Sequence, residues 1–362
     1  MLYETSSKYY VTCSVMNNCF FDKGKVLLAR HKTSRTLVAI KHFNLEEFTQ
    51  EQYDLIMEEI FFMRQLKHPN ILPCLTSYVI NFDLYVVSPL MGFTSCHDLI
   101  SAHFQDGLSE IIISFFLRDV LRALDYIHSK GYIHRSVKAR HILVHADGHA
   151  CLSGFRYMYS LPKCGSLNKV HHFPLHTSHN LNWFSPELLE QNIEGYDEKS
   201  DIYSVGVTAC ELANGIVPFA DTSTTSMLTE KVRGVIPQLI DCTTWFLHDD
   251  DQYSKDEICY SNENIENENQ KIISRKFSNS FHAFVELCCC RNISIRPLPK
   301  QLLNHSFFKP IRRIGINLQE LLQPAVPYTE TNTTELHEDV AVINDLSYDF
   351  DDINIYPEEW DF

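Results

Sequence analysis

The feature that most constrains the fold is a change of hydrophobic pattern near residue 90. Before it, short runs rich in β-branched and aliphatic residues, such as residues 36–43, are separated by turn-forming residues, and this pattern predicts strands. Residues 49–66 differ, because Ile56 and Ile60 in this segment lie at helical spacing. The first quarter of the chain is therefore predicted to be rich in strands and to include one helix.

After residue 91 the pattern predicts long helices. Residues 108–131 carry the clearest signal, since Ser109 is placed to cap the start of a helix and Gly131 to end it. Between them, apolar residues recur at i, i+3, i+4 and i+7, namely Leu117, Val120, Leu121 and Leu124. Residues 141–154 predict a hairpin with Asp147 and Gly148 in its turn.

These patterns divide the chain into parts. We expect an α+β fold of two lobes, with a β-rich N-lobe at residues 1–90 and a helical C-lobe at residues 91–312. Residues 241–276 are rich in Asp, Asn and Glu and have little apolar periodicity, which predicts a poorly ordered insertion. Residues 313–362 are predicted to be an acidic tail, because residues 314–362 contain twelve Asp or Glu and no Lys or Arg.

Charge and composition exclude several classes of function. The net charge is −15 and lies mostly in the tail, which argues against nucleic acid or an anionic membrane as the partner. The longest apolar stretch, residues 110–117, is too short to span a bilayer, and no signal peptide is recognisable. Twelve cysteines without paired metal-ligand spacing are typical of a reducing compartment. We expect a cytoplasmic protein, with exchange into the nucleus left open.

One segment gathers side chains of the kinds that bind metals. It contains Cys164, His171, His172, His176 and His179, which could in principle hold Zn²⁺. Their spacing matches no structural zinc pattern, however. We therefore predict no metal site and expect these histidines to lie at the surface or in an interface.

The stretch YIHRSVKARH, residues 132–141, resembles the catalytic loop of protein kinases, H-R-D-L-x-x-x-N. Further kinase-like motifs occur in the order that kinases have them. They are VAIK with Lys41, Glu59 before HPN, SPE at residues 185–187, DIYSVG at residues 201–206, and IRP with Arg296. Together they resemble the protein-kinase fold over residues 9–311. This resemblance implies that the DIYSVG helix braces the catalytic loop and that Arg296 pairs with the Glu of SPE.

Four parts that phosphoryl transfer needs are replaced in this sequence. The Asp that accepts the substrate proton is Ser136, the metal-binding Asn is His141, and the Asp of D-F-G is Gly154. A hydroxyl is a poor proton acceptor near neutral pH, and Mg²⁺ prefers oxygen ligands to imidazole. The turn that should be glycine-rich, residues 17–22, has no glycine. We therefore predict a pseudokinase without enzymatic activity; the alternative is a weak, unconventional serine/threonine protein kinase.

The same resemblance implies an active-like shape and a degenerate nucleotide site. The Lys of VAIK and the Glu before HPN are expected to form an ion pair, and Met63, His134 and Phe155 are expected to stack as a spine. Two alternatives stay open for the site, which is either empty or holds ATP without Mg²⁺. The expected nucleotide-binding residues are Lys41, Glu59, Ser88, Met91, Lys138 and Arg156, with Lys138 or Arg156 balancing the phosphate charge.

Among kinase-like proteins, HRSVKARH, LSGFR, KSDIYSVGVTACELANGIVPF and LLNHSFFK together resemble the Sterile-20-related adaptor (STRAD) pseudokinases. That family ends in Trp-Glu-Phe, and this sequence ends in Trp360, Asp361 and Phe362. The resemblance implies an allosteric activator of the liver kinase B polarity kinase. It also implies a three-part complex with the helical-repeat scaffold mouse protein 25, which would bind the terminal tripeptide. An ATP-sensing scaffold without this partner is the remaining alternative.

The resemblance also indicates where the partner kinase docks. It is expected to contact the activation segment, residues 154–187, as a substrate would. Large apolar side chains in this segment are candidate anchors, because such groups dominate protein interfaces. They are Tyr157, Phe173, Leu175, Trp183 and Phe184.

Overall fold

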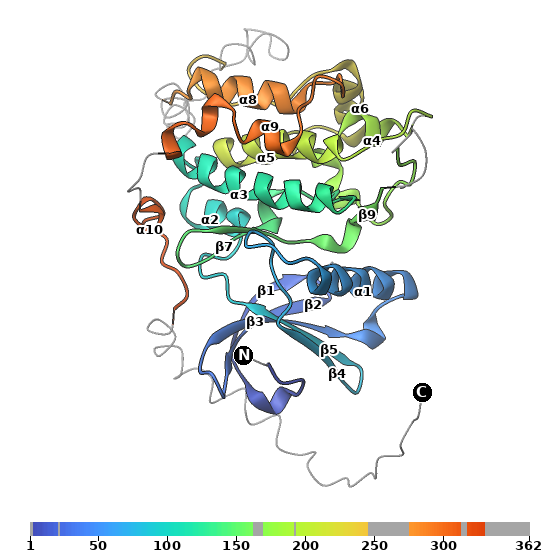
Figure 1. The fold of residues 1–362 in the computed structure, drawn as a ribbon, viewed down its shortest axis with the longest axis vertical. Helices are drawn as coiled ribbons and strands as arrows, with labels where there is room; N and C mark the ends of the chain where they lie inside the picture. Colours follow the sequence, from blue (N-terminus) through green and yellow to red (C-terminus); the bar gives the residue numbers. More distant parts are fainter. Residues whose placement is uncertain are drawn as a thin grey trace, which may run out of the picture. The chain divides into compact units, whose positions relative to one another are not determined.

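Figure 1 shows the fold in a computed structural model of the chain. The structure describes residues 3–20, 22–161, 169–191, 193–244, 275–312 and 317–329. Two compact units are present. The strand unit is built from the described residues of Met1–Glu47, Leu75–Leu90 and Tyr328–Phe362, and the helical unit from those of Phe48–Cys74 and Met91–Pro327.

The strand unit is one five-stranded antiparallel sheet in the order β1-β2-β3-β5-β4. Its strands are β1 (Tyr10–Cys19), β2 (Gly24–His31), β3 (Leu37–Asn44), β4 (Thr76–Ile80) and β5 (Asp83–Pro89). One face buries Ala29, Val38, Ile40 and Val87 together with the rings of two tyrosines. Burial alternates along the first half of β3, where Val38 and Ile40 are buried, whereas the pattern that predicted the strands is their run of β-branched and aliphatic residues.

The turn between β1 and β2 has no glycine, yet it contains two residues with positive φ. Phe20 has φ of 51° and Asp22 has φ of 62°. The Phe20 side chain is 3% exposed, and its ring lies edge-on to Phe43 with 6.0 Å between centroids. Burial of this ring offsets the backbone strain, so an apolar contact holds a turn that in kinases is a flexible glycine-rich loop.

The helical unit consists of helices joined by short strands and turns. Its α-helices are α1 (Gln50–Gln65), α2 (Cys96–His103), α3 (Glu110–Ser129), α4 (Pro186–Glu190), α5 (Lys199–Asn214), α6 (Thr224–Arg233), α8 (Asn279–Cys289), α9 (Pro299–Leu302) and α10 (Leu318–Leu321). Two small antiparallel ladders pair β6 (Tyr132–Ile133) with β9 (Tyr159–Ser160), and β7 (Ile142–Val144) with β8 (Ala150–Leu152). Short 3-10 helices include η3 (Ala139–His141), η4 (Phe155–Tyr157) and η5 (Ser178–Trp183).

Local sequence signals set the ends of the main helices. Thr49 caps α1, since its hydroxyl accepts from Gln52 N and its own amide donates to the Gln52 side chain. Helix α5 ends at Gly215, whose φ of 77° suits glycine.

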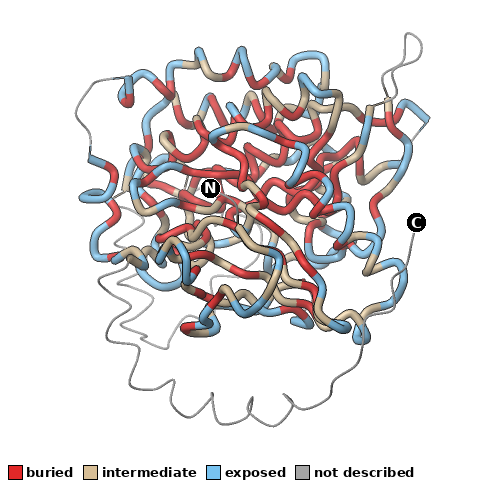
Figure 2. The backbone as a smooth tube through the Cα atoms, turned by 60° about the horizontal axis from the view of Figure 1, so that its bottom comes forward, coloured by how far each residue is buried: buried red, intermediate tan, exposed pale blue. Residues whose placement is uncertain are grey.

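The predicted apolar stripe of α3 is fully buried, and α5 is buried along almost its whole length. Figure 2 colours these buried residues red. Helices α3, α5 and α8 therefore form the core of this unit.

One predicted local feature is confirmed, and one differs. The β7–β8 hairpin forms with Gly148 at φ of 91° in its turn. The cysteines of residues 288–290 lie at the end of α8, where Cys288 and Cys289 are buried. The predicted lobe of residues 1–90 differs from the strand unit, because α1 packs on η4 and so joins the helical unit.

The predicted insertion and tail lie largely outside the described residues. At the start of the insertion, Asp241 is fully buried and accepts from Thr243 N, Phe277 N and His282 Nε2. At the start of the tail, α10 packs its Leu318 side chain against Gly148. Among the described helices, none is long and apolar enough to cross a membrane.

Candidate functional site

The catalytic-loop segment, residues 134–141, is held by a carboxylate of α5. Asp201 is fully buried and accepts from His134 N, Arg135 N and His128 Nε2, each at 2.8 Å. Burial alone would raise the pKa of Asp201, but the hydrogen bonds from His128 and the loop amides lower it, so the carboxylate is ionised. These contacts confirm that the DIYSVG helix braces the loop.

His134 packs in the interior as a neutral ring. Its Nδ1 accepts from Ser136 N at 3.2 Å, and its Nε2 therefore donates to Ser153 O at 3.1 Å. Burial lowers the pKa of His134 to about 4. The ring meets Phe155 edge-on at 5.5 Å, and Met63 of α1 is also buried. The three predicted spine residues are thus interior residues of the helical unit.

Ser136, at the position of the kinase proton acceptor, is already hydrogen-bonded within the protein. Its hydroxyl accepts from Asn180 Nδ2 at 3.1 Å and lies 3.1 Å from His141 Nδ1. His141 Nδ1 also donates to the Ser136 carbonyl at 2.7 Å. Since a carbonyl oxygen can only accept, Nδ1 carries the proton. Ser136 is 3% exposed. Its hydroxyl oxygen carries no negative charge and is already in contact with two hydrogen-bond donors of the protein, Asn180 Nδ2 and His141 Nδ1.

Gly154 and His141 form one packed pair. Gly154 has φ of 82°, and a Cβ built on it would lie 2.6 Å from both Cγ and Nδ1 of His141. The imidazole therefore occupies the space that the Asp of D-F-G would need. Burial, and then the charge of Lys138, hold the pKa of His141 well below its usual value. The two replacements lie thirteen residues apart in the sequence. They are linked by packing, because the His141 ring fits here only while residue 154 has no side chain.

Arg156 approaches the glutamate of α1. Its Nε lies 3.5 Å from Glu59 Oε2, and both side chains are largely buried. Sequence analysis predicted that Arg156 balances the charge of a nucleotide phosphate and that Glu59 forms an ion pair with Lys41. In the structure, η4 brings Arg156 to Glu59 within the helical unit, whereas Lys41 lies on β3 of the strand unit.

The ammonium of Lys138 points to the activation segment. It donates to Asn180 Oδ1 at 2.6 Å and lies 5.1 Å from the centre of the Trp183 ring. Burial and the nearby Arg156 charge lower the pKa of Lys138 to about 7. Asn180 thus joins Lys138 to Ser136. Sequence analysis missed this residue, although its place five positions before the SPE motif was an available signal.

A buried glutamate of α5 supports the same segment. Glu211 Oε2 accepts from Ala139 N at 3.0 Å and from Trp183 Nε1 at 2.8 Å. Burial raises the pKa of Glu211 to about 7. Sequence analysis missed Glu211, because a lone Glu in an apolar helix has no motif of its own.

The other predicted nucleotide-binding residues lie at the end of β5 and just after it. Ser88, on β5, is buried and donates from Oγ to Ala39 O at 3.4 Å. Met91 follows the strand, is buried, and belongs to the helical unit.

Three of the predicted partner anchors are buried, which corrects that prediction. Tyr157, Trp183 and Phe184 are at most 9% exposed, so in this conformation they offer a partner almost no surface. Phe173 is half buried, with its ring 6.0 Å from that of Phe184. Leu175 is 61% exposed and remains a candidate anchor. Sequence analysis predicted these three aromatic residues as anchors because their side chains are large, but in the structure their rings are buried inside the protein. Trp360, Asp361 and Phe362 lie outside the described residues.

The guanidinium of Arg135, next to this segment, forms its hydrogen bonds with neutral groups. The guanidinium donates to Tyr157 O and to the hydroxyl of Tyr196, and it lies 4.7 Å from the centre of the Tyr159 ring.

The histidines considered as metal ligands are exposed, namely His171, His172, His176 and His179. His176 Nε2 lies 2.9 Å from Glu51 Oε2. No three potential ligands come together for a metal among the described residues, which exclude Cys164.

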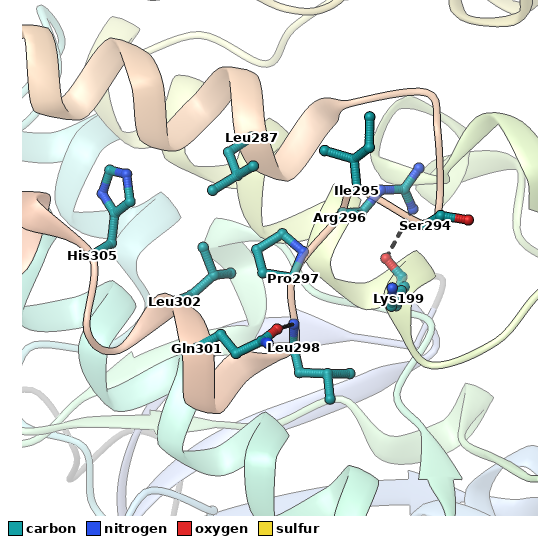
Figure 3. A pocket seen from close by; sticks show the side chains of 10 residues that line it. All are labelled: Lys199, Leu287, Ser294, Ile295, Arg296, Pro297, Leu298, Gln301, Leu302 and His305. Carbon is teal, nitrogen blue, oxygen red and sulfur yellow. Dashed lines mark hydrogen bonds between the residues drawn. The ribbon is translucent and has the colours of Figure 1, made fainter.

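Arg296 pairs with the Glu of the SPE motif as predicted. Its Nη1 and Nη2 donate to Glu187 Oε1 at 2.6 Å and Oε2 at 3.2 Å, and Nη1 also donates to Lys199 O. Figure 3 shows Arg296 in the wall of a hollow of about 530 Å³. Leu287, Ile295, Pro297, Leu298 and Leu302 give this hollow an apolar lining.

The fold and the altered catalytic loop define the class as a protein-kinase domain. The family described as "Protein kinase domain" matches residues 22–308. The STE20-related kinase adapter protein alpha of Gallus gallus is 42% identical over 352 residues, covering 93% of this chain and 90% of the relative. The Homo sapiens alpha protein is 40% identical over 366 residues (98% and 84%), and the Homo sapiens beta protein is 35% identical over 339 residues (90% and 81%). The chain therefore belongs to the STE20-related kinase adapter (STRAD) family.

Proposed function

We propose that the chain is a catalytically inactive pseudokinase that activates a partner protein kinase allosterically. The observation that carries this proposal is the interlocked set of Ser136, His141 and Gly154, in which the His141 ring fills the space of a metal-binding carboxylate. Phosphoryl transfer requires a proton acceptor and oxygen ligands for Mg²⁺. None of these three positions supplies the carboxylate or amide oxygen that kinases use for these roles, so the retained fold serves as a binding surface rather than a catalyst.

The proposed partner is a kinase of the liver kinase B type, and the proposed scaffold is the mouse-protein-25 helical repeat. The printed names of the relatives, which are kinase adapter proteins, support an adaptor role. To activate its partner, the chain must bind the active conformation more tightly than the inactive one. A tenfold shift in that equilibrium requires about 1.4 kcal/mol of differential binding. We propose that the complex acts in the cytoplasm and exchanges with the nucleus.

The deciding experiment measures peptide phosphorylation by the partner kinase with scaffold, in the presence and absence of this chain. We expect the chain to increase partner activity about tenfold, which needs about 1.4 kcal/mol of differential binding. A kinase-dead partner serves as the control and should leave no activity. Phosphorylation that persists with the dead partner and disappears in a Lys41→Met chain would instead establish a weak kinase. An unchanged partner rate would refute the adaptor role.

The end of the chain is the proposed anchor for the scaffold. Trp360 and Phe362 flank Asp361 in an acidic segment, and aromatic anchors of this kind typically contribute about 2–4 kcal/mol to binding. A tail peptide carrying Trp360→Ala and Phe362→Ala should therefore bind the scaffold about 30- to 1,000-fold more weakly than the native peptide. Equal affinity of the two peptides would remove the tail from the proposal.

We also propose that the chain binds ATP without a divalent metal. Lys138 and Arg156 are buried cations of the catalytic-loop region, while His141 and Gly154 offer Mg²⁺ no oxygen ligand from a side chain. ATP should therefore raise the melting temperature equally in EDTA and in Mg²⁺, because ligand binding stabilises the folded state. Stabilisation only with Mg²⁺ would contradict the proposal, and no stabilisation would mean an empty site.

A further inference from the structure

Lys231 of α6 is a charged residue buried outside the site described above. Its side chain is fully buried. The ammonium Nζ donates to three backbone carbonyls, which are Asn182 O at 2.6 Å, Phe184 O at 2.9 Å and Leu181 O at 3.4 Å. All three belong to residues 181–184, the part of the activation segment that leads into α4.

The surroundings of Lys231 show that these three contacts are its main polar interactions. The ammonium lies 5.3 Å from the ring centres of both Tyr203 and Phe219. Within the described part of the chain, no ion pair joins it to a carboxylate. Removing an ammonium from water is strongly unfavourable, and burial lowers the pKa of Lys231 to about 7. The carbonyl contacts are therefore what compensates for burying this side chain.

All four backbone carbonyls of residues 181–184 accept hydrogen bonds from side chains. Lys231 takes three of the four carbonyls, and Ser204 Oγ donates to the fourth, Trp183 O, at 2.8 Å. Two side chains of the stretch also donate, Asn182 Nδ2 to Pro218 O at 3.1 Å and Trp183 Nε1 to Glu211 Oε2 at 2.8 Å. This stretch cannot shift relative to α6 without breaking the three bonds to Lys231.

We propose that Lys231 is a positioning residue for the surface that the partner kinase contacts. Its ammonium binds the carbonyls of residues 181–184 and so fixes the path of the activation segment. The inference rests on the proposed function, because it assigns the shape of the docking segment to one buried lysine. Lys231 does not itself touch the partner, since it is fully buried.

The test compares four full-length proteins: the unaltered chain, Lys231→Met, Lys231→Arg, and the control Lys199→Met. Lys199 also donates to a backbone carbonyl, Ile293 O at 2.9 Å, but it lies outside the activation segment, residues 154–187. Hydrogen exchange of amides in residues 178–184 reports local order, and partner-kinase activation reports function. In Lys231→Met, exchange in this stretch should accelerate about tenfold or more while α3 and α8 keep their protection. Activation should fall by a similar factor.

The arginine variant and the control separate positioning from general stability. Lys231→Arg keeps the charge and several donors, so it should recover both readouts at least in part, and Lys199→Met should behave like the unaltered chain. Unchanged exchange of residues 178–184 in Lys231→Met would overturn the inference. If the unaltered chain does not activate the partner, the proposed function fails, but the exchange data still decide whether Lys231 holds the segment.

A measurement on the unaltered chain covers the case in which Lys231→Met does not fold. In ¹⁵N-lysine-labelled protein, the Lys231 ammonium signal should exchange its protons at least about tenfold more slowly than those of the exposed lysines, because three carbonyls hold them away from water. That signal should be missing in Lys231→Arg. A Lys231 ammonium signal that exchanges as fast as those of the exposed lysines would refute the inference.

Discussion

Adding a Cβ at Gly154 tests whether His141 occupies the space of the missing carboxylate. In Gly154→Ala, the new atom would lie 2.6 Å from the imidazole at a backbone φ of 82°. The left-handed conformation costs a non-glycine residue about 1–2 kcal/mol, and overpacking a filled site costs about 1–3 kcal/mol. We therefore expect the free energy of unfolding to fall by about 2–5 kcal/mol in urea titrations followed by circular dichroism.

Gly131 is the matched control for this experiment. It has nearly the same φ, 81°, but a Cβ there would meet nothing within 4 Å. Gly131→Ala should therefore lose only the conformational part, about 1–2 kcal/mol. In the double variant Gly154→Ala with His141→Ala, the clash disappears, so the two changes should couple favourably by about 1–3 kcal/mol. Equal losses for the two glycine variants, or no coupling with His141, would refute the packing argument.

Three further predictions follow from buried charges and exposed side chains. Arg296→Met leaves Glu187 buried without its partner, so unfolding free energy should drop by about 3–5 kcal/mol in urea titrations; a loss below about 1 kcal/mol would contradict this. His134 has a folded pKa of about 4, below the ordinary 6.5, so its contribution to stability is complete above pH 6.5 and is lost as the pH falls toward 4. Urea midpoints that stay constant from pH 7 to 4 would disprove that assignment. Leu175→Asp should leave the melting temperature unchanged and weaken partner binding about tenfold, whereas the equally apolar control Leu298→Asp should not, as measured by surface plasmon resonance.

The sequence by itself determined the types of elements and their order. Apolar residues at helical spacing predicted α1 and α3, β-branched runs predicted β2 and β3, and Asp147 with Gly148 predicted the β7–β8 turn. These signals are local, since a helix or strand repeats its burial every few residues and caps act within one turn. The resemblance to protein kinases also implied the pairing of Arg296 with Glu187.

Only the tertiary structure decided how the altered positions fit together. Ser136 meets Asn180 across 44 residues, and Lys231 meets Phe184 across 47. No periodicity connects such positions, because the contacts depend on how α5, α6 and η5 pack. The burial of Tyr157, Trp183 and Phe184 could not be predicted for the same reason. The size of an aromatic ring does not indicate whether the ring faces the interior or the surface. Side-chain identity set the chemistry available at each position, and long-range packing set which of those groups meet.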